Sequence, residues 1–566
     1  MRRWRSFSSL MVLGLVLAAC QSGNSQSAVP SASTAASAEA SVAPFVPTSY
    51  PAAGPADCKY GGEFSQIKAV DELTVEFDLC HPDPAFLAKT ALASNDIQDS
   101  DYLAANMVNH LILARPNGTG PYKFKEYVRG DHITLVRNDS YWGTKATAAT
   151  VIFQWNAEAA ARLLALQAGT VDGIDNPGPD DFATIKADAT LALKDRPALN
   201  TMYVGMTNTF APFDNIKVRQ ALAMGIDRQR IIDNFYPAGS TVADYFTPCA
   251  ITDACDGTKW YTFDKTAANA LLDSVFGAGK RFSTHIFYRD VVRGYLPNPG
   301  VVATELQSQL KNNLGITADI KVQESATFLD NSSKGLLDGL YLLGWGADYP
   351  DPTNFLDYHF NNPSNKQFGR IDKSITDPLT TGGQSSDPAA RTAAYTAANS
   401  AIRDFVPMIP IAHGASATAW KADVKNAHSS PLTDEYMAVM DPGGRPQLVF
   451  MQNAYPISLY CGDESDGETI RVCGQIFETL YTFKVGTAEV TPGLADSCTA
   501  DSAGTVWTCK LHPSVTFHNG ARFDAGDVVS TFAVQWDATN PLHIGRTKTF
   551  EYWGALFGTF LNAPAS

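Results

Sequence analysis

Apolar and polar residues alternate over short stretches of this chain, and other stretches carry apolar residues at helical spacing. Residues 73–79 switch between apolar and polar side chains at every position, which predicts a half-buried strand. Residues 158–167 form an Ala- and Leu-rich helical segment that stops at Gly169, a residue type preferred just beyond a helix end. Asp214 precedes a second helical segment, in which apolar residues of positions 218–226 share one face. Strand and helix patterns alternate, so we expect a mixed α/β protein.

An apolar run at residues 336–343 predicts a buried strand, and the residues after it predict how that strand ends. Pro350 and Pro352 lack the N–H group that strand pairing needs, so we expect pairing to stop before them. Gly344 and Gly346 lie at the end of the run, where small residues let a ligand approach the backbone. The segment is therefore a candidate binding site.

Asp348 is the chemically informative residue of this segment, because it places a carboxylate between two aromatic residues, Trp345 and Tyr349. A desolvated carboxylate is costly unless it meets a cation, so such a site suits an ammonium group. Two alternatives remain open: a tight turn in which Asp348 caps its own backbone, and a Trp345 that serves only core packing. Asp351 and Asn354 are expected to fix the turn that follows.

These residues resemble the GW-x-x-D-Y-x-D-P signature of the extracytoplasmic solute-binding proteins, family 5, which serve peptide, nickel and related ABC importers. Other stretches of the chain resemble the same family, and together the matches span nearly all of the chain after its leader. They are residues 118–124, 135–142, 166–172 and 212–228.

The resemblance implies a two-lobed periplasmic-binding-protein-like fold (type II, large cluster C type) with a hinge and an interlobe cleft. Residues 203–207 and 408–411 would be the strands that cross the hinge. The implied function is a receptor that captures a solute, most often a peptide, by lobe closure and delivers it to the permease subunits of an ABC importer. The residues implied to bind the ligand are Asp348, Trp345, Gly344, Gly346, Tyr349, Thr119 and Gly120, although the glycines beside Thr119 are also compatible with a tight chain crossing.

The family's segments occur in an unusual order. Residues 477–495 and 515–529 resemble the opening of the mature family members, yet they come last in this chain. Each segment appears once, so we expect a circular permutation rather than a duplication, which also predicts that Phe560 lies near Lys59. The expected parts are a larger lobe from 58–206 and 447–566, a smaller lobe from 207–411, and a return to the larger lobe with a connector at 412–446.

The first residues have the pattern of a secretion signal. Arginines precede a short apolar run within residues 1–20, and that run is too short to span a bilayer. The run ends in a sequence that resembles a bacterial lipobox, which implies a lipid on Cys20; an ordinary cleaved signal is the alternative. Residues 21–56 are rich in Ser, Ala and Pro and predict a flexible tether. We therefore expect an extracytoplasmic protein anchored to the membrane by lipid.

The cysteine count supports export. Nine cysteines leave eight without Cys20, and sequence neighbours suggest four local disulfides in an oxidising compartment. A metal site is the rival interpretation, but no C-x-x-C or His-rich spacing favours it. The expected pairs are Cys58 with Cys80, Cys249 with Cys255, Cys461 with Cys473, and Cys498 with Cys509.

Composition and missing motifs exclude several function classes. The net charge of −15 argues against nucleic-acid binding, which needs a basic surface. The sequence has no G-x-S-x-G elbow, Walker A loop or zinc motif, so we expect no enzyme activity, cofactor or metal. We expect a monomer. An oligosaccharide or nickel chelate as ligand, or a sensory role without transport, remains an alternative.

Overall fold

The computed structural model describes residues 45–362 and 365–564. The predicted signal, Cys20 and the first part of the tether lie outside these residues. Within the described chain, no helix is both long and apolar enough to cross a membrane. The tether prediction needs a correction at its end, because Thr48–Tyr50 forms strand β1, which pairs with residues 67–69. The Tyr50 hydroxyl also donates to Asp537, so these residues are part of the folded protein.

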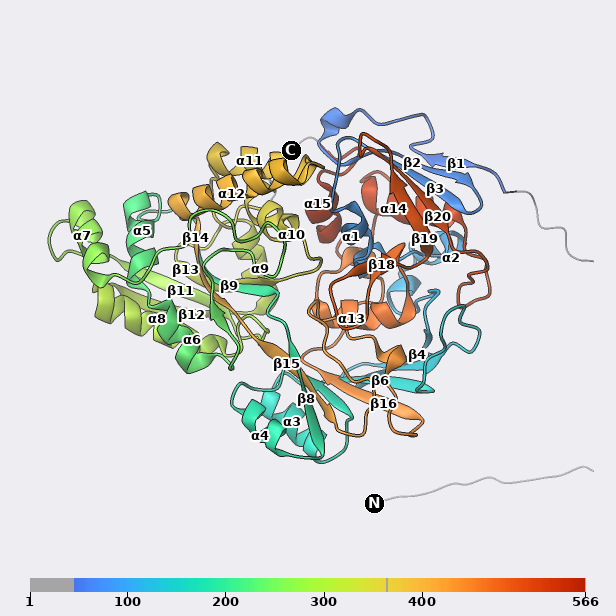
Figure 1. Ribbon diagram of the computed structural model, residues 1–566, viewed down its shortest axis with the longest axis horizontal. Helices are drawn as coiled ribbons and strands as arrows, with labels where there is room; N and C mark the ends of the chain where they lie inside the picture. Colours follow the sequence, from blue (N-terminus) through green and yellow to red (C-terminus); the bar gives the residue numbers. More distant parts are fainter. Residues whose placement is uncertain (1–44, 363–364, 565–566) are drawn as a thin grey trace, which may run out of the picture. The chain divides into compact units, whose positions relative to one another are not determined.

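Three large sheets form the scaffold (Figure 1). A five-stranded antiparallel sheet has the order β1, β2 (Phe64–Asp71), β3 (Thr74–Leu79), β20 (Val506–Leu511), β19 (Ala495–Ala500). A seven-stranded sheet has the order β4 (Tyr122–Val128), β5 (His132–Arg137), β6 (Thr150–Trp155), β16 (Gln447–Gln452), β7 (Gly173–Asp175), β15 (Ser416–Lys421), β8 (Leu191–Arg196). A small hairpin pairs β17 (Tyr481–Phe483) with β18 (Val490–Pro492).

The third sheet has six strands in the order β10 (Thr241–Val242), β14 (Met408–His413), β9 (Asn200–Met206), β13 (Leu340–Gly346), β11 (Ser283–Arg289), β12 (Thr317–Gln323). We call residues 200–413, which contain this sheet, the smaller lobe, and the remaining described residues the larger lobe. The smaller lobe carries α5 (Ile216–Gly225), α6 (Arg228–Phe235), α7 (Lys265–Phe276), α8 (Pro299–Leu314), α9 (Ser325–Ser333), α10 (Pro352–Leu356), α11 (Lys373–Gln384) and α12 (Pro388–Phe405).

The larger lobe carries α1 (Phe86–Thr90), α2 (Ser100–Asn106), α3 (Ala159–Gln167), α4 (Asp181–Ala187), α13 (Gly467–Ile476), α14 (Ala525–Trp536) and α15 (Glu551–Phe557). The strand predicted at residues 73–79 is β3, and the helix predicted at residues 158–167 is α3. The helix predicted after Asp214 is α5, which is capped by the side chain of Asn215 through the N–H of Lys217.

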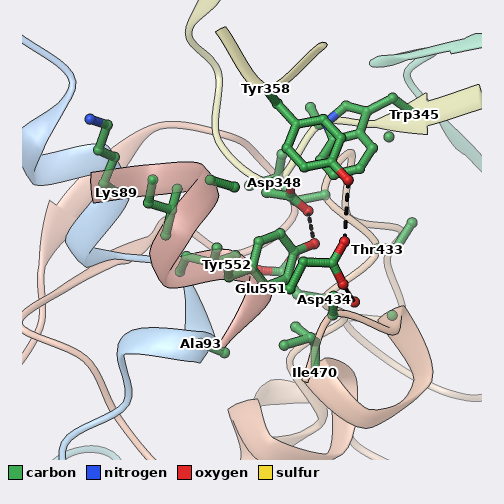
Figure 2. Close-up of a pocket in the computed structure, with 18 of the residues that line it drawn as sticks. Lys89, Ala93, Trp345, Asp348, Tyr358, Thr433, Asp434, Ile470, Glu551 and Tyr552 are labelled. Atoms are coloured by element: carbon green, nitrogen blue, oxygen red, sulfur yellow. Dashed lines mark hydrogen bonds between the residues drawn. The ribbon is translucent and has the colours of Figure 1, made fainter. Parts of the chain in front are cut away.

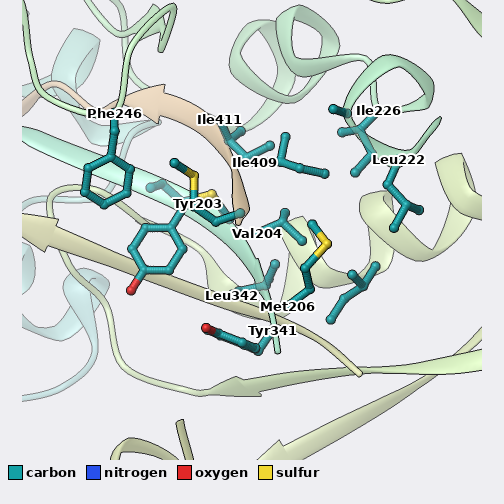
Figure 3. Packing of buried hydrophobic residues seen from close by; sticks show 14 of the residues in the cluster. Tyr203, Val204, Met206, Leu222, Ile226, Phe246, Tyr341, Leu342, Ile409 and Ile411 are labelled. Carbon is teal, nitrogen blue, oxygen red and sulfur yellow. The ribbon is translucent and has the colours of Figure 1, made fainter. Parts of the chain in front are cut away.

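Burial of apolar side chains holds each sheet to its helices. In the smaller lobe, side chains from the three central strands pack against residues at the end of α5, as Figure 3 shows. These side chains are almost fully buried, and burial of each such side chain contributes roughly 1.5–3 kcal/mol. The residues include Val204 and Met206 of β9, Leu342 of β13, Ile409 of β14, and Leu222 with Ile226.

The chain crosses between the lobes twice, and both crossings are short. Residues 197–199 connect β8 to β9, and residues 414–415 connect β14 to β15. The expected hinge strands, residues 203–207 and 408–411, instead lie mostly inside the six-stranded sheet, because β9 pairs with both β14 and β13. The Asn200 side chain ties the crossings together: it donates to Gly414 O at 2.7 Å and accepts from Gly414 N at 2.8 Å.

The end of the chain lies beside residues near Lys59, as the sequence predicts. Glu63 N donates to Phe557 O at 2.9 Å, and Gly62 forms an antiparallel bridge with Gly558. The C-terminal strand β20 pairs with β3, and β16 pairs with β6. This proximity is confirmed, whereas the evolutionary rearrangement that it fits stays a prediction.

All four predicted disulfide pairs are confirmed. Their Cα atoms lie 5.5, 5.1, 6.5 and 4.0 Å apart, in chain order. Cys498 and Cys509 face each other across the β19–β20 hairpin. Among the described residues, the group of side chains close enough to share a metal is Asp96 with Cys461 and Cys473, whose sulfurs are bonded to each other.

Candidate ligand-binding site

A cavity of about 1880 Å³ is lined by both lobes. Its volume exceeds the roughly 300–1,000 Å³ of pockets that hold drug-sized molecules, so it has room for an extended ligand. The smaller lobe contributes the end of β13 and the segment after it. The larger lobe contributes α13, the first residues of α15 and the segment around residue 434.

Asp348 lines this cavity two residues beyond the end of β13. The turn that holds it is built as the sequence predicts. Asp351 caps α10 by accepting from Thr353 N at 3.0 Å, and Pro352 occupies the first turn of that helix. The strand β13 ends at Gly346, before both prolines, and Pro352 begins α10.

The Asp348 carboxylate accepts two hydrogen bonds, one from each lobe, and Figure 2 shows the one from Tyr552 of the larger lobe. Asn354 Nδ2 donates to Oδ2 at 3.0 Å, and the Tyr552 hydroxyl donates to Oδ1 at 2.7 Å. Asn354 Oδ1 accepts from Asp348 N at 3.0 Å and from Trp345 Nε1 at 3.2 Å, which fixes the orientation of the Asn354 amide. The carboxylate is thus held by neutral donors in one position.

Burial raises the pKa of Asp348 to about 6, although the hydrogen bonds from Asn354 and Tyr552 lower it and the nearby charge of Glu551 raises it. Within residues 45–362 and 365–564, no ion pair ends on Asp348. The cavity therefore presents a desolvated carboxylate that has neutral donors and no cation. An ammonium group supplied by a ligand would stabilise its charge.

The aromatic wall beside Asp348 differs from the prediction in one residue. Trp345 is partly exposed to the cavity and stacks on Tyr358, with ring centroids 4.2 Å apart and planes at 23°. Tyr349, predicted as a second wall, is only 1% exposed and packs in the core of the larger lobe, where its hydroxyl bonds to Thr353 Oγ1. Tyr358 forms the second aromatic wall instead of Tyr349. No pattern in the sequence predicted this role for Tyr358.

Both predicted glycines line the cavity, for different reasons. A Cβ at Gly344 would lie 2.3 Å from the Tyr295 ring and 2.5 Å from Thr201 O, so packing inside the protein requires a glycine there. A Cβ at Gly346 would meet nothing within 4 Å. The open space beside Gly346 is therefore available to a ligand.

Thr119 and Gly120 lie behind the cavity wall and do not line it. Thr119 is fully buried, and its hydroxyl donates to Glu478 Oε2 at 2.8 Å. Gly120 N donates to Ile476 O, and a Cβ at Gly120 would lie 2.7 Å from that oxygen. The prediction that these residues contact the ligand is corrected to a supporting role, because close packing against α13 leaves them no exposed surface.

An ion pair that sequence reasoning missed joins the lobes inside the cavity. Arg293 Nη1 of the smaller lobe lies 3.1 Å from Glu468 Oε1 on α13. The Glu468 side chain is 5% exposed and that of Arg293 is 23% exposed. The two residues are far apart in sequence, and neither belongs to a motif.

Four charged residues form a cluster beside the cavity and neutralise one another. Arg196 and Arg471 each contact both Asp175 and Glu435, at distances between 2.5 and 2.9 Å. The two arginines hold the pKa of both carboxyl groups below their usual range, against the effect of burial. This closed cluster fixes β7 and β8 to α13 and offers no unpaired charge to a ligand.

Comparisons with known proteins show which sequences and folds this chain resembles. The family model for bacterial extracellular solute-binding proteins, family 5, matches residues 29–367 and 489–550. The dipeptide-binding protein of Escherichia coli strain K12 is 29% identical over 375 residues, covering 65% of this chain and 70% of that protein. Heme-binding protein A of Haemophilus influenzae is 29% identical over 382 residues, covering 66% and 69%.

A crystal structure of a dipeptide-binding protein from Pseudoalteromonas sp. SM9913, in complex with Met-Leu, is also similar. It superposes with a TM-score of 0.59 at 26% identity and covers 67% of this chain and 73% of that chain. The two-lobed α/β fold predicted from the sequence is confirmed by this likeness.

Proposed function

Because this chain belongs to family 5 of the bacterial extracellular solute-binding proteins, we propose that it is a receptor that captures peptides outside the cytoplasm and delivers them to an ABC importer. It is a binding protein and not an enzyme. Relatives named for dipeptide binding support a peptide as the ligand class.

The single observation that carries the proposal is the environment of Asp348. Its carboxylate lines the cavity, accepts bonds from both lobes and has no ion pair with a described residue. The α-ammonium group of a peptide would pair with it. Hydrogen bonds to charged groups contribute roughly 1.5–3 kcal/mol each. Because one of the present donors, Tyr552, comes from the larger lobe, ammonium binding and lobe closure would favour each other.

The strand that leads to Asp348 supports an extended peptide. β13 pairs with β9 along its whole length but with β11 only at Leu340 and Tyr341. Beyond Tyr341, the opposite edge of β13 has no strand partner among the described residues, and residues 343–346 line the cavity. A peptide backbone would pair with this edge in the manner of strand addition. The C-terminal carboxylate of the peptide would contact Arg289 or Arg293, both of which line the cavity.

Isothermal titration calorimetry with the tripeptide Ala-Ala-Ala and its N-acetylated form tests the proposal. We expect the free tripeptide to bind, and acetylation or Asp348→Asn to weaken binding at least tenfold. Asp319→Asn is the matched control, because Asp319 is an exposed carboxylate of the same lobe outside the cavity. Equal binding of both tripeptides, or wild-type affinity in Asp348→Asn, would overturn the amine anchor. Binding of maltotriose, a nickel chelate or haem in place of peptides would identify an alternative ligand class.

We further propose that a lipid on Cys20 anchors the receptor and that residues 21–44 serve as its tether. The basis is the lipobox-like sequence that ends at Cys20. Metabolic labelling with a radioactive fatty acid should mark the wild-type protein and leave Cys20→Ala unlabelled. Labelling of the variant would contradict the anchor.

We also infer that the chain is a circular permutation of the family's usual order. The family match in two separate segments and the bond between Glu63 and Phe557 support this. In this arrangement the larger lobe combines residues before the first crossing at 197–199 with residues after the second at 414–415.

A further inference from the structure

Glu551, the first residue of α15, places a second carboxylate beside Asp348 (Figure 2). The Tyr358 hydroxyl donates to Glu551 Oε1 at 3.2 Å, and Ser465 Oγ donates to Oε2 at 3.0 Å. Both donors are neutral, and no described cation forms an ion pair with Glu551. The negative charge of Glu551 contributes to raising the pKa of Asp348, so the two carboxylates repel each other.

Most of the other cations that line the cavity are already paired with a carboxylate. The lining cations Lys89, Arg196, Arg293, Arg471, Lys484 and Arg546 each form an ion pair. Among the lining residues that the structure describes, Arg289 and Lys366 are the cations without one. Further lining carboxylates without an ion pair to a described residue are Asp96, Asp357, Asp434, Asp466 and Glu478.

Three of these carboxylates, Asp96, Asp357 and Asp466, each have a buried oxygen without a hydrogen-bond partner among the described residues. Asp466 Oδ2 is buried and accepts no hydrogen bond within the described residues, while its Oδ1 caps α13. Burial raises the pKa of Asp466 to about 7. A buried acceptor without a donor costs roughly 1–3 kcal/mol. A cationic group of a ligand in the cavity would relieve this cost.

We propose that Glu551 makes the site selective for peptides whose first residue carries a second positive charge, namely an N-terminal Lys or Arg. This inference rests on the proposed function of Asp348. One α-ammonium group neutralises one of the two carboxylates and leaves the other unpaired. A second cation on the first side chain neutralises both. The stacked pair of Trp345 and Tyr358 adds an aromatic face on which such a cation packs favourably.

Glu551 has an alternative role as a helix-stabilising residue. An acidic side chain in the first turn of a helix interacts favourably with the helix dipole by roughly 0.3–1 kcal/mol. That role predicts an effect of substitution on stability and none on the choice between neutral and basic peptides. Comparing neutral and basic peptides therefore distinguishes a role of Glu551 in ligand selection from a role in helix stability.

The test compares the dissociation constants of Ala-Ala-Ala, Lys-Ala-Ala and Glu-Ala-Ala by isothermal titration calorimetry at low and moderate salt. For the wild-type protein we expect Lys-Ala-Ala to bind about tenfold more tightly than Ala-Ala-Ala, and Glu-Ala-Ala to bind most weakly. In Glu551→Gln the preference for Lys-Ala-Ala should fall to less than threefold, whereas Glu551→Asp should retain most of it. Glu158→Gln is the matched control, because Glu158 is an exposed glutamate at the start of α3 whose side chain caps nothing.

Each outcome decides between the two proposals. Equal affinity of the wild-type protein for Ala-Ala-Ala and Lys-Ala-Ala would overturn the charge selection and leave peptide binding intact. An undiminished Lys preference in Glu551→Gln would show that another carboxylate of the cavity is responsible and would overturn the role of Glu551. Binding of none of the tripeptides by the wild-type protein would overturn the proposed function and the selection with it. Circular dichroism of both Glu551 variants checks that they fold.

Discussion

The Tyr552 hydroxyl donates a 2.7 Å hydrogen bond to Asp348 Oδ1, and the two residues belong to different lobes. Tyr552 is the second residue of α15 in the larger lobe, whereas Asp348 follows β13 in the smaller lobe. The group proposed to bind the ligand is therefore completed by the lobe that closes over it. Any movement at residues 197–199 and 414–415 that separates the lobes would break this bond and change the pKa of Asp348.

Replacing Tyr552 with Phe should weaken peptide binding and shift its pH dependence upward. The hydrogen bond from Tyr552 lowers the pKa of Asp348, so its loss should raise that pKa above about 6. We expect Ala-Ala-Ala to bind about fivefold to tenfold more weakly at pH 7, as measured by titration calorimetry between pH 5 and 8. Tyr127→Phe is the control, since that hydroxyl bonds to Pro456 O away from the cavity. If the pH at which peptide affinity is half lost were the same in Tyr552→Phe as in the wild-type protein, the hydrogen bond would not control the pKa of Asp348.

Peptide affinity of the wild-type protein should fall as the pH drops below about 6. The pKa of Asp348 is about 6 without ligand, and a protonated carboxyl group cannot pair with an ammonium group. Well below that pKa the affinity should fall about tenfold per pH unit. Above about pH 8 the peptide's own amino group loses its charge. In Asp348→Asn, peptide affinity should not fall between pH 6 and pH 5. If it still falls, a group other than Asp348 is responsible for the pH dependence.

Asp348→Asn should stabilise the unliganded protein at neutral pH. The folded-state pKa of about 6 lies above the 3.8 that is usual for an aspartate, so the folded protein binds the proton more tightly than the unfolded chain does. Ionised Asp348 therefore destabilises the folded protein. This destabilisation is absent below about pH 4, grows as the pH rises to about 6, and is complete above that pH. We expect a gain of about 1–3 kcal/mol at pH 7.5 and almost none at pH 4. Thermal unfolding of both proteins at pH 7.5 and pH 4 measures this gain in stability. An equal gain at both pH values would show that it does not come from the raised pKa of Asp348.

Arg293 and Glu468 should be energetically coupled across the cavity. Removing the arginine leaves the Glu468 carboxylate, only 5% exposed, without its cation. Arg293→Ala should lower the thermal stability of the unliganded protein, and Glu468→Gln should offset much of that loss in the double variant. A double-mutant cycle should give a coupling of about 1–2 kcal/mol. Additive effects would show that the ion pair contributes nothing to holding the lobes together.

A chain relinked in the usual family order should fold to the same structure. In such a variant, residues 447–562 precede residue 45 through a flexible linker, and the chain ends at residue 446. Because Asn562 and Tyr50 both donate hydrogen bonds to Asp537, the ends to be joined lie near each other, and the β3–β20 and β6–β16 pairs stay intact. We expect a melting temperature within a few degrees of the original and unchanged peptide binding. Failure of the relinked chain to fold would argue against the permutation.

The sequence by itself determined the features that depend on neighbouring residues. The alternation at residues 73–79 predicted β3, and four local cysteine pairs predicted the disulfides, because each pattern sets the geometry of its own segment. The apolar run at residues 336–343 predicted a strand, which the structure places at Leu340–Gly346. The motif around Asp348 likewise identified a carboxylate that the structure places in the cavity.

Only the tertiary structure decided which distant side chains meet that carboxylate and which predicted ones do not. Tyr552 and Glu551 reach the cavity from a helix about two hundred positions away along the chain, so no local pattern could indicate them. Tyr349 and Thr119 carry suitable chemistry, but packing buries both of them. Whether a polar or aromatic side chain faces a ligand or a core depends on which surfaces the lobes bury, and that is a property of the whole fold.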